Sequence, residues 1–180
     1  MVPEDTGVCT SPSPQGCIEE EEAKVTEAVT LTGSCHCGAI RATLHASRPA
    51  AELEVRACQC SFCTRHGAKT VSDAAGRCRF EIDGAALSWY LFETRTGMSL
   101  ICSRCGTYAG VMIEDGHNVW SVLNARGLAV AEFKDRAAEP RDYEGETREQ
   151  RIARRKATWT PTEIVWRGAD RTGSDPSRKS

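Results

Sequence analysis

The chain has 180 residues and a mass of 19.6 kDa, which suits one domain with tails, since domains cluster near ~100–150 residues. A net charge of −2 and a pI of about 6.1 exclude a strong basic field for nucleic acid or an anionic membrane. There is neither a membrane-spanning apolar run nor an export signal, so we expect a cytoplasmic protein without a membrane partner. The unusual feature is ten cysteines, which here favour metal ligands or catalytic thiols over disulfides.

Both ends of the chain have the composition of tails. Residues 1–29 are acidic and hold almost no large apolar side chain, so they cannot offset the entropy of becoming ordered. We predict a disordered acidic tail, in which Cys9 and Cys17 have no site role. Residues 167–180 also lack large apolar side chains and are predicted to be a second disordered tail. One domain is therefore expected over residues 30–166.

Between these tails, short runs with apolar or alternating character predict β-strands. The predicted strands cover residues 39–46, 53–58, 79–82, 87–92, 98–102, 108–113 and 118–123. Turn signals such as Asp83-Gly84 and Asp115-Gly116 separate neighbouring runs. Residues 141–159 are mostly charged with helical character, and Ile152 and Trp159 are their expected inward-facing anchors. The chain should thus be mainly β, with antiparallel sheets and a short C-terminal helical segment.

Two cysteine pairs have the spacing of metal ligands. Cys35-His-Cys37 is a C-x-C pair whose side chains leave one face of a strand, and Cys102-Ser-Arg-Cys105 is a C-x-x-C pair whose sulfurs meet across a turn. Tetrahedral zinc requires sulfurs about 3.8 Å apart, and each pair can supply two of its four ligands. We predict one closed structural zinc site on these four cysteines. Cys78 stands alone and is expected to be a small buried hydrophobic residue.

The remaining cluster, Cys58-Gln-Cys60-Ser-Phe-Cys63, holds three thiols within six residues. Three protein ligands and one open position are the arrangement of a catalytic zinc ion, whereas His66 or another cysteine could instead close a second structural site. The spacing favours the open arrangement and leaves the closed one as an alternative. Three thiolates over-neutralise Zn²⁺, so an open site of this kind would suit a thiolate or a carbonyl–thiol adduct better than hydrolysis.

Three segments in this order carry a family resemblance: Gly33-Ser-Cys-His-Cys-Gly38, the cluster at residues 58–63, and Ile101-Cys-Ser-Arg-Cys-Gly-Thr107. Over roughly residues 30–135 the chain resembles the glutathione-dependent formaldehyde-activating enzyme family, which also contains the centromere protein V domain. The resemblance implies a β-tent of antiparallel sheets with two zinc ions, a structural one and a catalytic one on Cys58, Cys60 and Cys63. It also implies a carbon–sulfur lyase that condenses formaldehyde with glutathione to S-hydroxymethylglutathione.

The leading hypothesis is a zinc enzyme acting on a small aldehyde, imine or thiol adduct, with His66 as the first candidate for the catalytic base. The alternative is a non-catalytic, zinc-stapled interaction module, and a redox or zinc-relay dithiol is a third hypothesis. The helical segment carries five bases, which we interpret as a solvated face rather than a nucleic-acid footprint: Arg148, Arg151, Arg154, Arg155 and Lys156. A fourth protein ligand at the three-cysteine cluster would favour the module, whereas an open position in a pocket would favour the enzyme.

Overall fold

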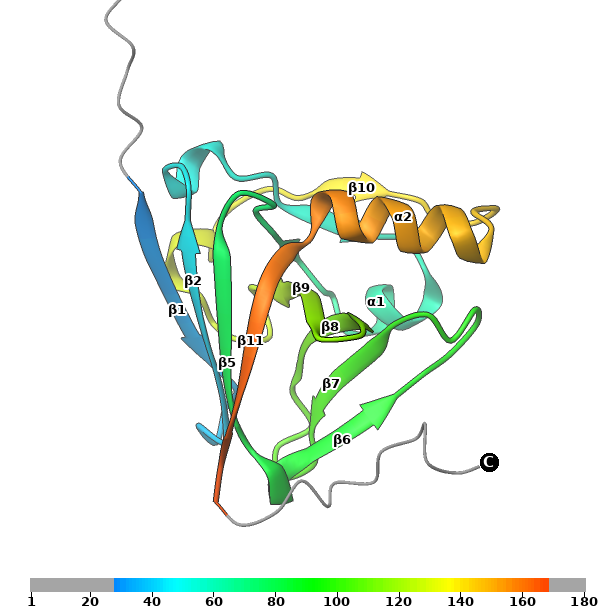
Figure 1. The fold of residues 1–180 in the computed structure, drawn as a ribbon. Helices are drawn as coiled ribbons and strands as arrows, with labels where there is room; N and C mark the ends of the chain where they lie inside the picture. The colour runs from blue at the N-terminus through cyan, green and yellow to red at the C-terminus, as the bar shows by residue number, and fades with distance from the viewer. Residues whose placement is uncertain (1–27, 169–180) are drawn as a thin grey trace, which may run out of the picture.

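The computed structural model describes residues 28–168, so that nearly all of both predicted tails, with Cys9 and Cys17, lies outside the described residues. Strands dominate this part of the chain, in agreement with the predicted mainly-β class (Figure 1). The strands are β1 (Val29–Ser34), β2 (Ile40–Ala46), β3 (Arg56–Cys58), β4 (Thr70–Val71), β5 (Arg77–Asp83), β6 (Leu87–Tyr90), β7 (Met98–Cys102), β8 (Tyr108–Asp115), β9 (Asn118–Asn124), β10 (Glu139–Arg141) and β11 (Thr160–Arg167). The α-helices are α1 (Ser61–Arg65) and α2 (Arg148–Thr158).

The strands form two layers. One layer has the order β1-β2-β5-β11, and the other contains the antiparallel neighbours β6, β7, β8 and β9, which β4, β3 and β10 extend. β11 links the layers, because its first residues pair with β9 and the following ones with β5. The layers converge near the β5–β6 connection and open toward α2 (Figure 1). The open end is where a site can form.

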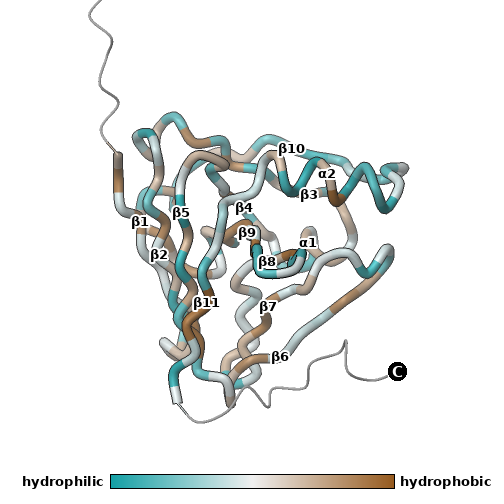
Figure 2. Tube along the Cα trace, viewed as in Figure 1, coloured by the Kyte–Doolittle hydropathy of each residue, from teal (hydrophilic) through white to brown (hydrophobic). Residues whose placement is uncertain are grey.

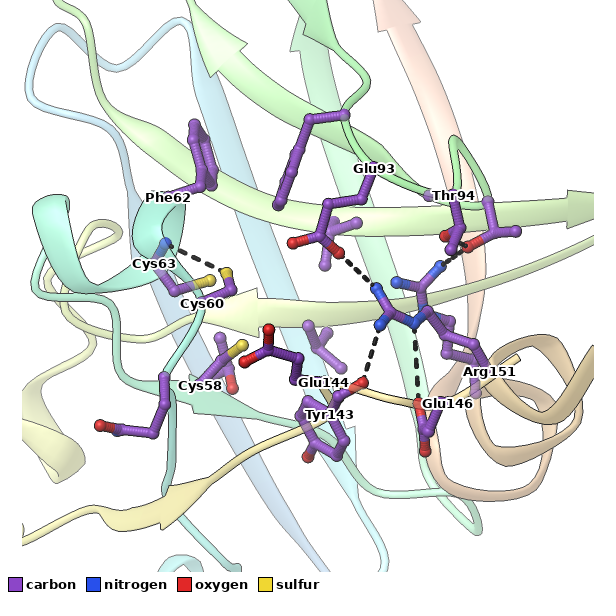
Figure 3. A pocket seen from close by; sticks show the side chains of 18 of the residues that line it. Cys58, Cys60, Phe62, Cys63, Glu93, Thr94, Tyr143, Glu144, Glu146 and Arg151 are labelled. Atoms are coloured by element: carbon purple, nitrogen blue, oxygen red, sulfur yellow. Dashed lines mark hydrogen bonds and ion pairs between the residues drawn. The ribbon is translucent and has the colours of Figure 1, made fainter. Parts of the chain in front are cut away.

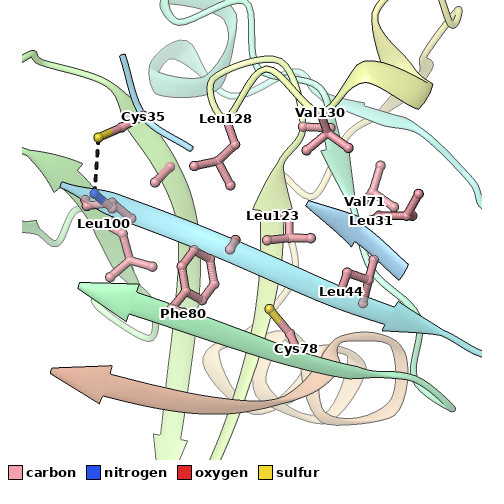
Figure 4. Packing of buried hydrophobic residues seen from close by; sticks show 14 of the residues in the cluster. Leu31, Cys35, Leu44, Val71, Cys78, Phe80, Leu100, Leu123, Leu128 and Val130 are labelled. Carbon is pink, nitrogen blue, oxygen red and sulfur yellow. Dashed lines mark hydrogen bonds between the residues drawn. The ribbon is translucent and has the colours of Figure 1, made fainter. Parts of the chain in front are cut away.

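The apolar core fills the space between the two layers. On β2, buried and exposed positions alternate, so Ile40 and Leu44 point inward. Phe80 on the neighbouring strand β5 and Leu100 on β7 of the other layer belong to the same core cluster, and all four side chains are fully buried (Figure 4 labels Leu44, Phe80 and Leu100). Cys78 lies in the same core, where burial raises its pKa to about 12. Its prediction as a buried hydrophobic residue is confirmed.

The expectation of purely antiparallel sheets is wrong at two strand pairs. β11 pairs parallel with β5, and β10 pairs parallel with β3. Parallel neighbours need a long crossover, and the connection from β5 to β11 contains most of the domain, including α2. Alternation in a sequence reports which face a side chain occupies, but not the direction of the neighbouring strand.

Four strands have no counterpart among the predicted ones: β1, β4, β10 and β11. The predicted strand at residues 53–58 is shorter in the structure: β3 begins only at Arg56, and a 3₁₀ turn, Ala50–Glu52, precedes this segment. The guanidinium of Arg136 holds this turn by donating hydrogen bonds to the carbonyls of Ala50 (2.9 Å) and Leu53 (3.1 Å). A long-range contact of this kind overrides the local strand preference.

The predicted helical segment 141–159 is shorter in the structure, since α2 starts only at Arg148. Thr147 and Gln150 form a capping box, in which each side chain accepts a hydrogen bond from the other's backbone N–H (3.2 and 2.9 Å). Trp159, which follows the helix, is buried as expected, and Ile152 is half-buried. Figure 2 shows the largely hydrophilic character of α2. Over residues 28–168, every helix is too short or too polar to span a membrane.

Candidate metal centre and adjoining cavity

The four predicted structural ligands come together in space. Cys35 and Cys37 lie between β1 and β2, while Cys102 ends β7 and Cys105 follows it in the turn before β8. The Sγ of Cys37 is 3.7 Å from that of Cys35 and 3.5 Å from that of Cys102, and all four sulfurs lie within 4.8 Å of one another. These separations fit a tetrahedral ion with four sulfur ligands. Gly106, directly after Cys105, has a φ of 73°, the left-handed conformation that the turn requires.

The three-cysteine cluster is a second, separate group. Cys58 ends β3, Cys60 is the N-cap residue of α1, and Cys63 lies in the helix. Their three sulfurs lie within 4.8 Å of one another, and the backbone N–H of Cys63 donates to the Sγ of Cys60 at 3.5 Å. Within residues 28–168, no fourth His, Cys, Asp or Glu belongs to this group, and His66 is not part of it. Among the described residues the group thus has three members, the number that the open arrangement requires.

The three thiols of this group cannot ionise independently. Hydrogen bonds from the thiols of Cys58 and Cys63 lower the pKa of Cys60 to about 2. The same contacts act in the opposite sense on the partners: the hydrogen bond with Cys60 raises the pKa of Cys58, and that with Cys58 raises the pKa of Cys63. One thiolate is thus stabilised by two protonated neighbours. A bound cation would stabilise three thiolates together, and sulfur ligands of this kind suit zinc.

The three-cysteine group faces a cavity of about 640 Å³ (Figure 3). Next to the thiols the wall is aromatic, with contributions from Phe62, Phe92 and Tyr108. The rings of Phe62 and Tyr108 pack edge to face, with their centroids 5.0 Å apart. Burial, reinforced by the neighbouring cysteine sulfurs, raises the pKa of Tyr108 well above its usual range, so its hydroxyl stays protonated. This wall combines an apolar surface with one hydroxyl near the thiols.

The opposite wall is charged and consists of α2 and the loop before it. Glu146 accepts hydrogen bonds from Nε (2.6 Å) and Nη2 (2.8 Å) of Arg154, whose guanidinium stacks 3.7 Å from the ring centroid of Tyr143. Arg151 lies 3.7 Å from Glu146 and donates to Glu93, on the β6–β7 connection, at 2.8 Å. The hydrogen bonds from Arg154 lower the pKa of Glu146, so this carboxylate stays charged and ties the loop to the helix.

The interpretation of the five helical bases as a solvated face is therefore wrong for three of them. Arg151, Arg154 and Arg155 line the cavity. Lys156, by contrast, pairs with Asp115 outside it, and Arg148 donates to the backbone carbonyl of residue 94 at 3.2 Å. Helical spacing showed that the bases share a helix, but not that this helix covers a cavity.

Comparison with known proteins assigns the chain to a family. Residues 30–141 match the model of the glutathione-dependent formaldehyde-activating enzyme family, which is more than half of the chain and includes both cysteine groups. The chain belongs to this family. A solved structure of a Rhodobacter sphaeroides protein is 24% identical, with 76% of this chain and 99% of that chain covered, at a TM-score of 0.43. The family name associates this fold with formaldehyde and glutathione chemistry.

The formaldehyde-activating-enzyme match ends before the charged wall of the cavity. Residues 142–159, which include the loop and α2, lie beyond it. Sequence reasoning missed the acidic members of this wall, among them Glu144, whose side chain extends into the cavity in Figure 3. The one signal in the sequence was Thr147-x-x-Gln150, which marks where the helix begins and so leaves Glu144 and Glu146 in a loop.

His66 lies at the C-terminal end of α1, beside the cavity rather than in its lining. The side chain is exposed, and its ring packs 4.5 Å from Phe62 and 5.4 Å from Tyr108, measured between ring centroids. Both of these aromatic residues do line the cavity. A catalytic role for His66 stays a prediction, because, of these three side chains, only Phe62 and Tyr108 line the cavity.

Proposed function

We propose that the chain is a zinc-dependent enzyme of the carbon–sulfur lyase type, which joins a small aldehyde or imine to a thiol. Formation of S-hydroxymethylglutathione from formaldehyde and glutathione is the reaction that family membership suggests first. The observation that carries the proposal is the group of Cys58, Cys60 and Cys63, which has no fourth protein ligand among residues 28–168 and opens onto a cavity of about 640 Å³. An open position favours an enzyme over a zinc-stapled interaction module.

The two cysteine groups would have different roles. We assign a structural zinc ion to Cys35, Cys37, Cys102 and Cys105, and a catalytic zinc ion to Cys58, Cys60 and Cys63, which makes two per chain. An ion held by three thiolates supplies a binding position for a substrate sulfur and a Lewis acid for an oxygen or nitrogen. The all-sulfur donor sets and their mutual distances, within 4.8 Å, support both assignments.

The chain's own residues would bind the substrate and move its proton. Phe62 and Phe92 give the thiol end of the cavity an apolar surface, which would strengthen polar interactions there. The hydroxyl of Tyr108 can donate a hydrogen bond to a carbonyl oxygen or to a thiolate sulfur at the same end of the cavity. We propose His66, whose ring packs against that of Tyr108 beside the cavity, as the group that takes up and returns the substrate's proton.

Replacement of Cys60 by serine tests the function. Serine is a preferred N-cap residue, so Cys60→Ser should keep α1 while it removes one thiolate from the cavity. We expect loss of one zinc ion per chain and of catalysed S-hydroxymethylglutathione formation, measured by metal analysis and by NMR exchange between formaldehyde and glutathione. Cys78→Ser, which removes a core thiol outside both groups, is the matched control. Undiminished turnover in folded Cys60→Ser protein would refute the proposal.

A second comparison tests the proton carrier. General acid–base groups contribute about 10²–10⁴-fold to rates, so His66→Gln should slow turnover by about 100-fold. Glu144→Gln is the natural comparison, because Glu144 lines the cavity and its carboxylate is an alternative proton carrier. If His66→Gln keeps its rate and Glu144→Gln loses it, the role belongs to Glu144.

A further inference from the structure

Three arginines of α2 each donate a hydrogen bond to one segment, the connection of residues 91–97 between β6 and β7. The three bonds run from Arg148 to the carbonyl of Thr94 (3.2 Å), from Arg151 to the carboxylate of Glu93 (2.8 Å, Figure 3) and from Arg155 to the hydroxyl of Thr96 (2.8 Å). Positions 148, 151 and 155 lie on one side of a helix, so α2 presents a single row of donors to the connection. The connection and α2 both line the cavity, and the bonds therefore join two of its walls.

The connection adopts a backbone conformation that its residues disfavour. Glu93 has a φ of 48° and Arg95 a φ of 52°, both in the left-handed region that residues other than glycine rarely occupy. A hydrogen bond from the backbone N–H of Arg95 to the carbonyl of Phe92, at 3.0 Å, closes the turn. A strained backbone of this kind persists only where surrounding contacts hold it. The row of donors on α2 supplies such contacts.

The closed arrangement is also costly on the side of the helix. Within residues 28–168, the Nε atoms of Arg151 and Arg155 are both buried without a hydrogen-bond partner. Burial, followed by repulsion from Arg154 and Arg151, lowers the pKa of Arg155 to about 10. The contact is close, since a Cβ built on Gly97 would lie 2.8 Å from Nη1 of Arg155. Separation of the connection from α2 would relieve this desolvation as well as the backbone strain, at the expense of three hydrogen bonds.

The connection carries part of the wall beside the three-cysteine group. Phe92 lines the cavity, and its ring lies 5.3 Å from that of Phe62, measured between centroids. Phe62 lies in α1 between Cys60, the N-cap residue, and Cys63. Movement of the connection away from α2 would therefore take Phe92 from the thiol end of the cavity and uncover that end.

We propose that residues 91–97 form a flap that opens to admit a ligand to the three-cysteine group, and that the arginine row of α2 is the latch that holds it closed. Strain and desolvation favour the open arrangement, whereas the three hydrogen bonds favour the closed one, so a ligand can shift the balance. The latch lies in a segment beyond the family match, which ends at residue 141. The flap concerns access to the cavity and does not depend on which reaction takes place there.

Hydrogen exchange of the full zinc-loaded chain, followed by mass spectrometry, measures the opening. Glu93→Gln removes the charge at one latch contact and Thr96→Val the acceptor at another, while both leave α2 intact. Each should speed exchange in residues 91–97 by about threefold, and the two together by about tenfold, as expected for the loss of partly exposed charged contacts. Arg95→Asn should slow exchange by about threefold, because the exposed Arg95 would be replaced by a residue that tolerates the left-handed conformation.

Access to the thiols is measured in parallel, as the rate at which N-ethylmaleimide labels the peptide with residues 58–63. This rate should change in the same proportion as exchange, since a metal ion at the thiols slows labelling equally in every variant. Asp115→Asn is the matched control: it removes the partner of Lys156, on the same helix but outside the cavity, and should change neither rate. Circular dichroism checks the fold of each variant.

Unchanged exchange in the double variant of Glu93→Gln and Thr96→Val would refute the latch, because α2 would then not hold the connection. Faster exchange with unchanged labelling would refute the flap, since the connection would move without uncovering the thiols. Equal effects in Asp115→Asn would mean a general loosening of α2 and would also refute the latch. Neither measurement involves turnover, so a chain that shows both effects but catalyses nothing would contradict the proposed function alone.

Discussion

Cys102→Ser should yield unfolded or insoluble protein that holds no structural metal. Cys102 is completely buried, and its group joins two segments 65 positions apart, counted from Cys37 to Cys102. A structural zinc site contributes an apparent free energy of about 10–16 kcal/mol, which is comparable with the whole stability of a domain at about 5–15 kcal/mol. Serine is a poor zinc ligand and would leave three thiols around an incomplete site. Circular dichroism and zinc content per chain measure the outcome.

The matched control for this variant is Cys78→Ser, a thiol buried to a similar extent in the core but outside both groups. It should cost no more than about 1–3 kcal/mol, the penalty for an unpaired buried hydroxyl, because the hydroxyls of Ser121 and Thr162 lie within hydrogen-bond reach of this side chain, and it should keep the full zinc content. Folded Cys102→Ser protein with one zinc ion per chain would mean that this group is not the structural site.

Cys63→Ser should have the opposite phenotype, with a normal β spectrum and no catalysis. Its group lies within one short segment, Cys58 to Cys63, so the loss of its metal opens no long loop of the chain. Replacing a residue that only hydrogen-bonds to a metal ligand lowers activity by about 10–100-fold. Removal of a ligand itself should therefore lower turnover by at least about 100-fold. We expect one zinc ion per chain and a melting temperature within a few degrees of the unmodified protein.

Measured together, the two cysteine variants distinguish the roles of the two groups. If Cys63→Ser unfolds the chain while Cys102→Ser stays folded and retains one zinc ion, the structural and catalytic assignments are reversed. If both variants unfold, the three-cysteine group also supports the fold, and its loss of activity would then say nothing about catalysis.

Local spacing was sufficient to identify the two cysteine pairs, the three-cysteine cluster and much of the β structure. Two cysteines at C-x-C or C-x-x-C spacing are held close by the geometry of one strand or one turn, so their pairing does not depend on the rest of the fold. The alternation in residues 40–46 likewise indicated which side chains of β2 are buried, because the period of two is a property of the strand itself. These predictions depend on contacts between neighbours in the chain.

Contacts between distant segments decided the rest. The parallel pairing of β11 with β5 and the position of α2 over the cavity both follow from how the end of the chain returns to its middle. In the sequence, Arg155 and Lys156 are adjacent bases on one helix. Only the fold places Arg155 against Thr96 and Trp159 without a carboxylate and leaves Lys156 paired with Asp115 at the surface. The surroundings of a charge depend on tertiary packing, because burial and partners come from segments far away in the chain.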